Sequence, residues 1–301
     1  MNKQLEQCPV ISAYEYDKLY FLVHRAYAYF FRKMDDKKKY IFPKTYYKKI
    51  KKFINESEII KNKVNNKNNL IKQIKSLVGK DNFVELSIRE YTGETNFCYA
   101  FNRVMRNFEK GLITLAYFMG PFLFAVNKYV KENPYYFKFN KDMTLYRNIK
   151  CSIFDYYLYR MNLNHIICFP SITSTSIKRV FHPSPLGQKV NTNGINPKDL
   201  IEITMIFNYK HNEGYISPGI IISNNIGKDG GYLSKHPGES EVILFPFTFA
   251  RITSVNRISN TQNIFEIQLD IINRYQYIEY TLKDKVEKRF KFDDFDKTFN
   301  K

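Results

Sequence analysis

The chain has 301 residues, of which 44% are hydrophobic and 17% aromatic. This composition excludes a disordered chain, and the length allows one large domain or two modest ones with a full hydrophobic core. The formal net charge of +18 raises the question of an anionic partner.

The positive charge is concentrated early in the sequence. Residues 1–90 hold 20 Lys and Arg against 10 Asp and Glu, and segment 32–52 interleaves ten cations with aromatic residues. Such a segment suits a nucleic-acid backbone or an anionic membrane surface. It is also typical of a solvated, lysine-rich pair of helices, and steering of an anionic substrate is a third interpretation.

The N-terminus and the apolar segments predict a cytoplasmic protein. The first 18 residues contain no apolar core of a signal peptide. The longest apolar run, residues 111–126, is too short to span a bilayer and is interrupted at Gly120-Pro121. The four cysteines form no CxxC pair, so we expect reduced thiols, although export without a signal peptide stays open.

The first half of the chain is predicted to be helical, because apolar residues recur at spacings of three and four. Gly79 is expected to end one of the helices, and the polar residues 59–69 indicate a linker. Helices are expected over 14–31, 69–80, 94–111 and 112–131. The residues expected on buried helix faces are Leu70, Ile74, Leu77, Val78, Phe97, Phe101, Val104, Met105 and Phe108.

From about residue 143 the pattern changes to short segments rich in β-branched and aromatic residues, separated by Gly, Pro, Asn and Asp. Helices followed by strands predict an α+β fold rather than an alternating doubly wound sheet. The expected strands are 143–149, 165–172, 200–209, 219–223, 241–255 and 263–272.

Several familiar catalytic motifs are missing from the sequence. It has no GxGxxG dinucleotide fingerprint, no phosphate-binding GxxxxGK[ST] loop, no HExxH and no GxSxG. The five histidines have neither metal-ligand spacing nor matching cysteine partners. We therefore expect no metal cofactor.

Three features in the strand half remain as candidates for chemistry. Arg147 lies in the strand "TLYRNIK", Ser174-Thr175-Ser176 lies in "SITSTSIK" 27 residues later, and Glu239 and Glu241 open "GESEVILFPFTFARI". Ser174 and Glu241 are 67 residues apart. Taken singly, each feature is ordinary: a strand arginine is usually an exposed rung, and alternate glutamates at a strand entrance share one solvated face.

In this order, the three features resemble the R-S-E motif of arginine-type mono-ADP-ribosyltransferases, the family of vertebrate ecto-enzymes and many bacterial toxins. Segment 91–106, "YTGETNFCYAFNRVMR", is similar to the "Y…LN..LR" helix of that family. Segment 232–252 resembles its "S…E.EVL.PP.T.F.V" stretch. The resemblance covers about residues 90–275. It implies two roughly perpendicular, mainly antiparallel sheets around an NAD cleft.

On the NAD side, the resemblance implies that the Arg147 guanidinium holds the pyrophosphate. Ser174 anchors the nicotinamide-side ribose or orients the ExE glutamate. The resemblance assigns Ser174, Thr175 and Ser176 together to cofactor binding, and within this strand, alternation turns Ser174 and Ser176 towards the cofactor and Thr175 to the other side. Phe181, in the loop expected over NAD, is a candidate to stack on nicotinamide.

On the acceptor side, the resemblance implies that Glu241 stabilises the oxocarbenium-like ribose, as in glycoside cleavage. Glu239, expected one pleat away on the same face, accepts the proton of an incoming guanidinium. Glu at the first ExE position indicates an arginine acceptor. Tyr232, in the loop 224–238, is expected to recognise the acceptor. Asn148 departs from the family, which commonly has glycine after the arginine.

The sequence thus predicts a monomeric transferase that uses NAD as substrate and modifies an acceptor protein presenting an arginine. Residues 1–85 form a basic helical extension and 281–301 a charged tail. The catalytic domain spans 86–280, with a helical lobe (86–140) and a strand-rich core (141–280). Two alternatives stay open: an NAD glycohydrolase on the same fold, and a catalytically idle basic module that binds nucleic acid or membrane.

Overall fold

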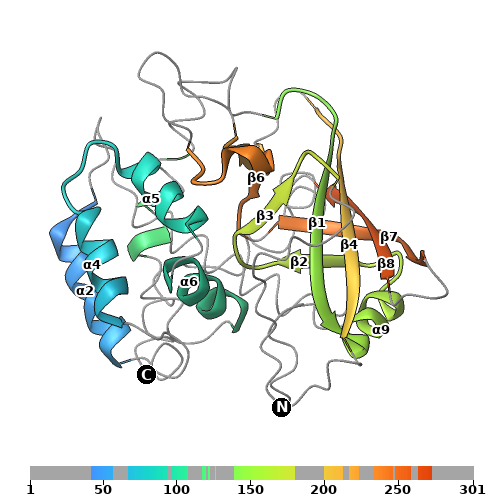
Figure 1. The fold of residues 1–301 in the computed structure, drawn as a ribbon, viewed down its shortest axis with the longest axis horizontal. Helices are drawn as coiled ribbons and strands as arrows, with labels where there is room; N and C mark the ends of the chain where they lie inside the picture. The colour runs from blue at the N-terminus through green and yellow to red at the C-terminus, as the bar shows by residue number, and fades with distance from the viewer. Residues whose placement is uncertain are drawn as a thin grey trace, which may run out of the picture.

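The computed structural model places a helical group beside a large β-sheet (Figure 1). It describes residues 42–56, 67–93, 96–107, 117–119, 121–122, 126, 139–179, 200–212, 217–223, 233–246, 248–258 and 264–272. The predicted mixture of helices and a large sheet is confirmed. The predicted helical character of residues 1–85 is not, because much of that region, including segment 14–31, lies outside the described residues.

The four helices described between residues 42 and 107 are amphipathic and bury their apolar stripes. Leu70 and Ile74 are fully buried, as the spacing predicts. Gly79, expected to end this helix, has a φ of +72°, a conformation that glycine adopts readily. The helices are α2 (Lys44–Glu56), α4 (Lys67–Ser76), α5 (Phe83–Thr92) and α6 (Asn96–Asn107).

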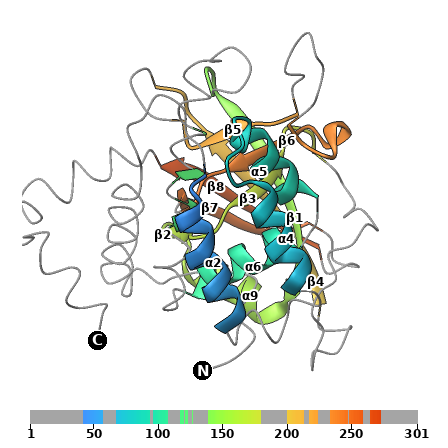
Figure 2. The same cartoon turned by 90° about the vertical axis from the view of Figure 1, so that its left-hand side faces the viewer.

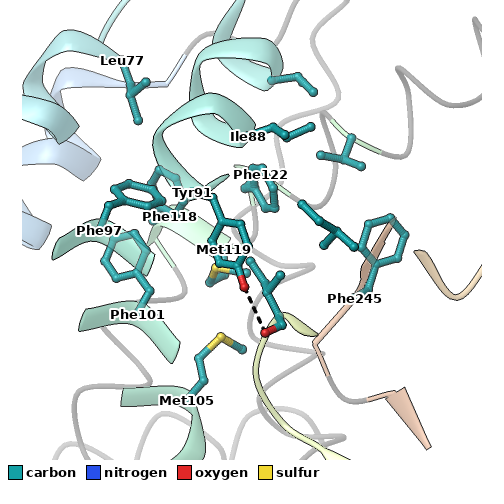
Figure 3. Packing of buried hydrophobic residues seen from close by; sticks show 14 of the residues in the cluster. Leu77, Ile88, Tyr91, Phe97, Phe101, Met105, Phe118, Met119, Phe122 and Phe245 are labelled. Atoms are coloured by element: carbon teal, nitrogen blue, oxygen red, sulfur yellow. Dashed lines mark hydrogen bonds between the residues drawn. The ribbon is translucent and has the colours of Figure 1, made fainter. Parts of the chain in front are cut away.

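An aromatic cluster fills the space between these helices and the sheet (Figure 3). Phe97 and Phe101 lie on α6 and pack edge-on with ring centroids 4.5 Å apart. Phe118 contacts both of them as well as Phe42 and Phe83. The same cluster takes in residues from both sides of position 85, from α2 and α4 as well as from α5 and α6. The domain boundary placed at residue 85 stays a prediction.

Eight strands follow one continuous hydrogen-bonded order, β2-β7-β8-β4-β1-β3-β6-β5. All the pairs are antiparallel except β4 with β8, which confirms a mainly antiparallel sheet. The strands are β1 (Met143–Ser152), β2 (Ile166–Phe169), β3 (Thr173–Ser176), β4 (Leu200–Tyr209), β5 (Gly219–Ile221), β6 (Glu241–Leu244), β7 (Thr248–Arg257) and β8 (Ile264–Ile272).

The link between β1 and β3 is the weakest junction in this order. One residue pair, Tyr146 with Ser176, joins them, whereas β1 and β4 pair along ten residues. In Figure 1, β1 and β4 run across the direction of β2 and β7. Two separate, roughly perpendicular sheets are not confirmed, since the described strands form a single twisted one.

The strand half contains a helix that the sequence analysis did not predict. Helix α9 (Ile153–Met161) begins directly after β1. A capping box fixes its start, because the Ser152 side chain accepts from the Asp155 backbone N–H and the Asp155 side chain accepts from that of Ser152. Tyr156 and Tyr159 point into a second core cluster, which lies against β1, β4, β7 and β8.

The expected strand 241–255 is two strands in the structure. β6 ends at Leu244 and β7 begins at Thr248, whose Oγ1 donates to the Phe245 carbonyl. Pro246, which cannot donate to a ladder, lies in this turn. The chain therefore leaves one end of the sheet with β6 and re-enters it in β7, between β2 and β8.

Helices α2, α4, α5 and α6 lie at the β3-β6-β5 end of the sheet (Figure 1). Figure 2 shows α2, α4, α5 and α6 in front, with the strands behind them. Tyr91 of α5 donates its hydroxyl hydrogen to the Ile172 carbonyl at 3.1 Å (Figure 3). Asn102 of α6 donates to the Tyr91 oxygen at 3.0 Å. These two hydrogen bonds connect α5 and α6 to Ile172, the residue directly before β3.

Candidate active site

Strands β3 and β6 bring Ser174 and Glu241 together. Their register pairs Ser176 with Glu241 and Ser174 with Ile243, so Ser174 lies diagonally across from Glu241. The Ser174 hydroxyl donates to Glu241 Oε1 at 2.7 Å. The two residues are 67 positions apart in the sequence and within one hydrogen bond in the fold.

Glu241 is a buried carboxylate with both oxygens hydrogen-bonded. It is 5% exposed, Ser174 donates to Oε1, and Ser234 donates to Oε2 at 2.8 Å. Burial raises the pKa of the Glu241 carboxyl, the two serine hydrogen bonds oppose that rise, and the nearby Glu239 adds to it. A carboxyl in such a site is held in one orientation.

Arg147 reaches the same group from β1. Its Nη1 donates to the Ser174 carbonyl oxygen at 2.6 Å, across the single-pair junction between β1 and β3. A guanidinium has five N–H donors in a planar fork. Within the described residues this hydrogen bond occupies one of them, which leaves donors for an anionic ligand such as a diphosphate.

The other two hydroxyls of the Ser-Thr-Ser strand face opposite ways, as strand alternation predicts. Thr175 is buried and donates to the Val242 carbonyl at 2.9 Å. Ser176 is partly exposed; it donates to the Glu239 carbonyl at 2.7 Å and accepts from the Lys178 backbone N–H. Both hydroxyls thus hold neighbouring backbone, and their contact with a cofactor stays a prediction.

Glu239 does not continue strand β6. It ends a short 3-10 helix, η3 (Pro237–Glu239), and Ser240 follows in the left-handed region with φ 51° and ψ 44°. The reasoning that alternation puts Glu239 one pleat from Glu241 is therefore wrong, because the strand begins only at Glu241. Glu239 is exposed, and its charge still acts on Glu241.

The junction of β1, β3 and β6 therefore gathers five of the predicted site residues: Arg147, Ser174, Ser176, Glu239 and Glu241. Two other predicted residues, Phe181 and Tyr232, lie outside the described residues. Their predicted contacts with nicotinamide and with an acceptor stay predictions. Residues 224–232 of the loop expected over 224–238 also lie outside the described residues.

Ser234 is the site residue that sequence reasoning missed. It is 4% exposed and contacts the carboxylate directly. It corresponds to the serine that opens the stretch "S…E.EVL.PP.T.F.V", which segment 232–252 resembles, but the sequence alone assigns it no role. Nothing in that spacing shows that the chain turns back and places this hydroxyl on Glu241.

The described residues offer neither a metal-binding cluster nor a membrane-spanning helix. They contain no group of three or more His, Cys, Asp or Glu side chains arranged to hold a metal ion. Among the same residues, no helix has the length and apolar character needed to cross a membrane.

No protein-family model matches this sequence, and no curated protein does either. Solved structures with a similar fold include the Vis toxin from Vibrio splendidus, with 18% identity, 64% of this chain and 74% of that chain covered, and a TM-score of 0.37. C3stau2 from S. aureus, solved with NAD, has 13% identity, coverage of 63% and 86%, and a TM-score of 0.40.

HopU1 of Pseudomonas syringae pv. Tomato DC3000 has 13% identity, coverage of 84% and 97%, and a TM-score of 0.43. Vis and HopU1 are described as ADP-ribosyltransferases. With TM-scores below 0.5 and identities below 20%, these likenesses leave the function to be argued from the residues of this chain.

Proposed function

We propose that this protein is an NAD-dependent mono-ADP-ribosyltransferase that moves ADP-ribose from NAD to an arginine side chain and releases nicotinamide. One observation carries the proposal: hydrogen bonds connect Arg147, Ser174 and Glu241 from three different strands. These are the three residues of the R-S-E pattern in the sequence, and the fold gathers them at one junction.

The arrangement fits a dinucleotide substrate. Arg147 supplies planar cationic donors that match a diphosphate. Glu241 is buried and fixed, so its negative charge can be aimed at a developing positive charge without reorganisation. In the proposed reaction the bond between ribose C1′ and the nicotinamide nitrogen breaks, nicotinamide leaves with the electron pair, and Glu241 stabilises the oxocarbenium-like ribose.

Glu239 is suited to the acceptor half of the reaction. Its side chain is exposed beside a buried carboxylate, on a segment whose backbone Ser176 holds. A guanidinium nitrogen of the acceptor forms the new bond to C1′, and its proton passes to Glu239. An exposed carboxylate can also pair with a guanidinium before the reaction, which supports arginine as the acceptor.

The test is to incubate the full chain with NAD and agmatine, a small guanidine, and to measure nicotinamide release and the ADP-ribosyl adduct. The proposal expects both products, and loss of both in Glu241→Gln. Nicotinamide release without adduct would replace the transferase with an NAD glycohydrolase. If a folded chain releases no nicotinamide, the proposed enzymatic function is wrong and a catalytically idle binding module is favoured.

The partners belong to the same proposal: an acceptor protein that presents an arginine, and an anionic surface or nucleic acid for residues 1–85. Within that region α2 carries exposed lysines at positions 44, 48, 49, 51 and 52. Binding of the full chain to duplex DNA or to vesicles with anionic lipid, measured against salt concentration, tests the second partner. Salt-insensitive or absent binding would leave these lysines as a solvated face.

A further inference from the structure

We propose that Ser234 is a positioning residue for Glu241, and that the carboxyl end of helix α5 anchors it. This inference rests on the proposed function, because it assigns Ser234 to the carboxylate that acts on NAD. It is carried by the contacts of the segment Ser234–His236, which joins α5 to the site.

The Ser234 hydroxyl makes two hydrogen bonds, one of them to Glu241. Its oxygen accepts from the His236 backbone N–H at 3.0 Å, and its own hydrogen points to Glu241 Oε2 at 2.8 Å. Its backbone N–H donates to the Ile222 carbonyl at 3.3 Å. An ionised carboxylate can only accept, so in this contact the hydroxyl supplies its one hydrogen while its oxygen accepts from His236.

Two donors from two elements fix the plane of the carboxylate. Ser174 on β3 holds Oε1 and Ser234 holds Oε2, so both ends of the group are pinned. The terminal torsion of a glutamate is otherwise broad and only two-fold. With Ser174 alone, the carboxylate could rotate about its Cγ–Cδ bond while keeping one hydrogen bond.

Helix α5 holds the segment from the other side. The Lys235 backbone N–H donates to Thr92 Oγ1 at 3.0 Å, and Lys235 Nζ lies 3.7 Å from Glu90 Oε1. Gly93 directly follows the helix, and a Cβ there would lie 2.8 Å from Lys235 Nζ, so a side chain at this position would require the end of the Lys235 side chain to move. The side chains of Ile88 and Tyr91 anchor α5 itself in the aromatic cluster (Figure 3).

Ser234 also affects the charge state of Glu241. The charged groups around this carboxyl are Glu239 and His236 on its own segment, Lys235 beside α5, and Arg147 on β1 behind Ser174. Burial raises the pKa of Glu241, and the hydrogen bond from Ser234 opposes that rise. Loss of this hydrogen bond therefore moves the pKa of Glu241 further up.

The experiment compares Ser234→Ala with Ser217→Ala in the full chain. Ser217 is a matched control, since its hydroxyl is also buried but donates to the Gly219 carbonyl instead of to Glu241. In Ser234→Ala we expect kcat for NAD cleavage to fall about tenfold at neutral pH, the effect of one hydrogen bond to a charged group. KM should stay within about twofold, and the acid limb of the pH profile should move to higher pH.

A second readout does not depend on activity. The pH titration of the Glu241 side-chain carboxyl carbon, measured by NMR on chain labelled with 13C-carboxyl glutamate and assigned with Glu241→Gln, should shift to higher pH in Ser234→Ala and not in Ser217→Ala. Ser234→Thr keeps the hydroxyl and should restore the native titration and most of the rate.

The possible results separate the two proposals. If the native chain releases no nicotinamide, the proposed function fails, whereas the NMR titration still tests the contact between Ser234 and Glu241. If the native chain is active and Ser234→Ala matches Ser217→Ala in both pH profile and titration, the positioning role of Ser234 is wrong.

Discussion

The two glutamates of the ExE segment lie two residues apart but belong to different kinds of structure. Glu241 opens β6, is 5% exposed and accepts hydrogen bonds from two serines. Glu239 ends η3, its side chain is exposed, and its backbone carbonyl accepts from Ser176. Ser240 lies between them in the left-handed conformation.

This difference shows how one short motif can supply two carboxylates with separate tasks. The turn at Ser240 ends the alternation of the strand, so burial of Glu241 does not require burial of Glu239. A fixed carboxylate suits the stabilisation of a charge at one place in a bound substrate. An exposed carboxylate suits an acceptor that arrives from solvent.

Glu241→Gln should have the largest effect on function. The substitution removes the charge that the site holds in place, so NAD cleavage and transfer to agmatine should both fall by roughly 10²–10³-fold, as for loss of one preorganised electrostatic group. Steady-state nicotinamide release and adduct formation measure the two rates. If adduct formation falls while nicotinamide release is retained, Glu241 acts on the acceptor rather than on NAD, and the roles given to Glu239 and Glu241 are wrong.

Glu239→Gln should separate the two activities. Since Glu239 is exposed and Ser176 holds only its backbone, the substitution should leave NAD cleavage within about threefold of the native rate. Transfer to agmatine should fall by about 10²-fold, the lower range for loss of a general base. The ratio of adduct to nicotinamide, measured in one reaction, gives the result. Equal loss of both activities would contradict the division of tasks.

Much of the fold can be read from the sequence, because burial patterns are local. The strand 200–209 was predicted with its observed limits, since its alternating apolar residues face the second core cluster. Helix α9 was missed although its signal was present: Ser152 and Asp155 have the spacing of a capping box. The dense aromatic residues that follow are equally typical of a strand-rich region.

The site is less predictable, because its contacts depend on tertiary structure. The order of Arg147, Ser174 and Glu241 pointed to the group that the fold brings together. The left-handed turn at Ser240 has no sequence signal, since serine rarely adopts positive φ. Ser234 reaches Glu241 through a tertiary contact between its segment and β6, which no local pattern specifies.

The unequal burial of Glu239 and Glu241 should also affect how the stability of the folded chain depends on pH. Burial raises the pKa of Glu241 in the folded state above its value in the unfolded chain. Between these two pKa values the folded state binds more protons, so the folded chain loses stability as pH rises through this range. Glu241→Gln removes that pH-dependent loss, so its Tm relative to the native Tm should rise between pH 4 and pH 7.5, each kcal/mol of regained stability being worth about 2–4 °C.

The control for this prediction is Glu239→Gln, which removes an exposed carboxylate from the same segment. Thermal unfolding of all three chains at pH 4 and pH 7.5 gives the comparison. The difference between Glu241→Gln and the native chain should shrink at pH 4, where the native carboxyl is protonated. A difference that is equal at both pH values would mean that packing rather than charge separates the two glutamates.

Thr92→Val should have the smallest effect, and it tests whether α5 supports both glutamates or only one. The substitution keeps the shape of the side chain but removes the acceptor of the Lys235 N–H, at a cost of about 1 kcal/mol in unfolding free energy. Because Lys235 adjoins Ser234, NAD cleavage should fall two- to fivefold. Transfer should fall in proportion, since the same segment leads into η3.

Thr253→Val is the matched control, because its hydroxyl bonds the Gln268 carbonyl on the exposed side of β7. It should change neither rate. If Thr92→Val lowers transfer much more than cleavage, the helix positions Glu239 through η3 rather than Glu241 through Ser234. If both rates stay native while stability falls, α5 supports the fold of the segment without setting the orientation of either carboxylate.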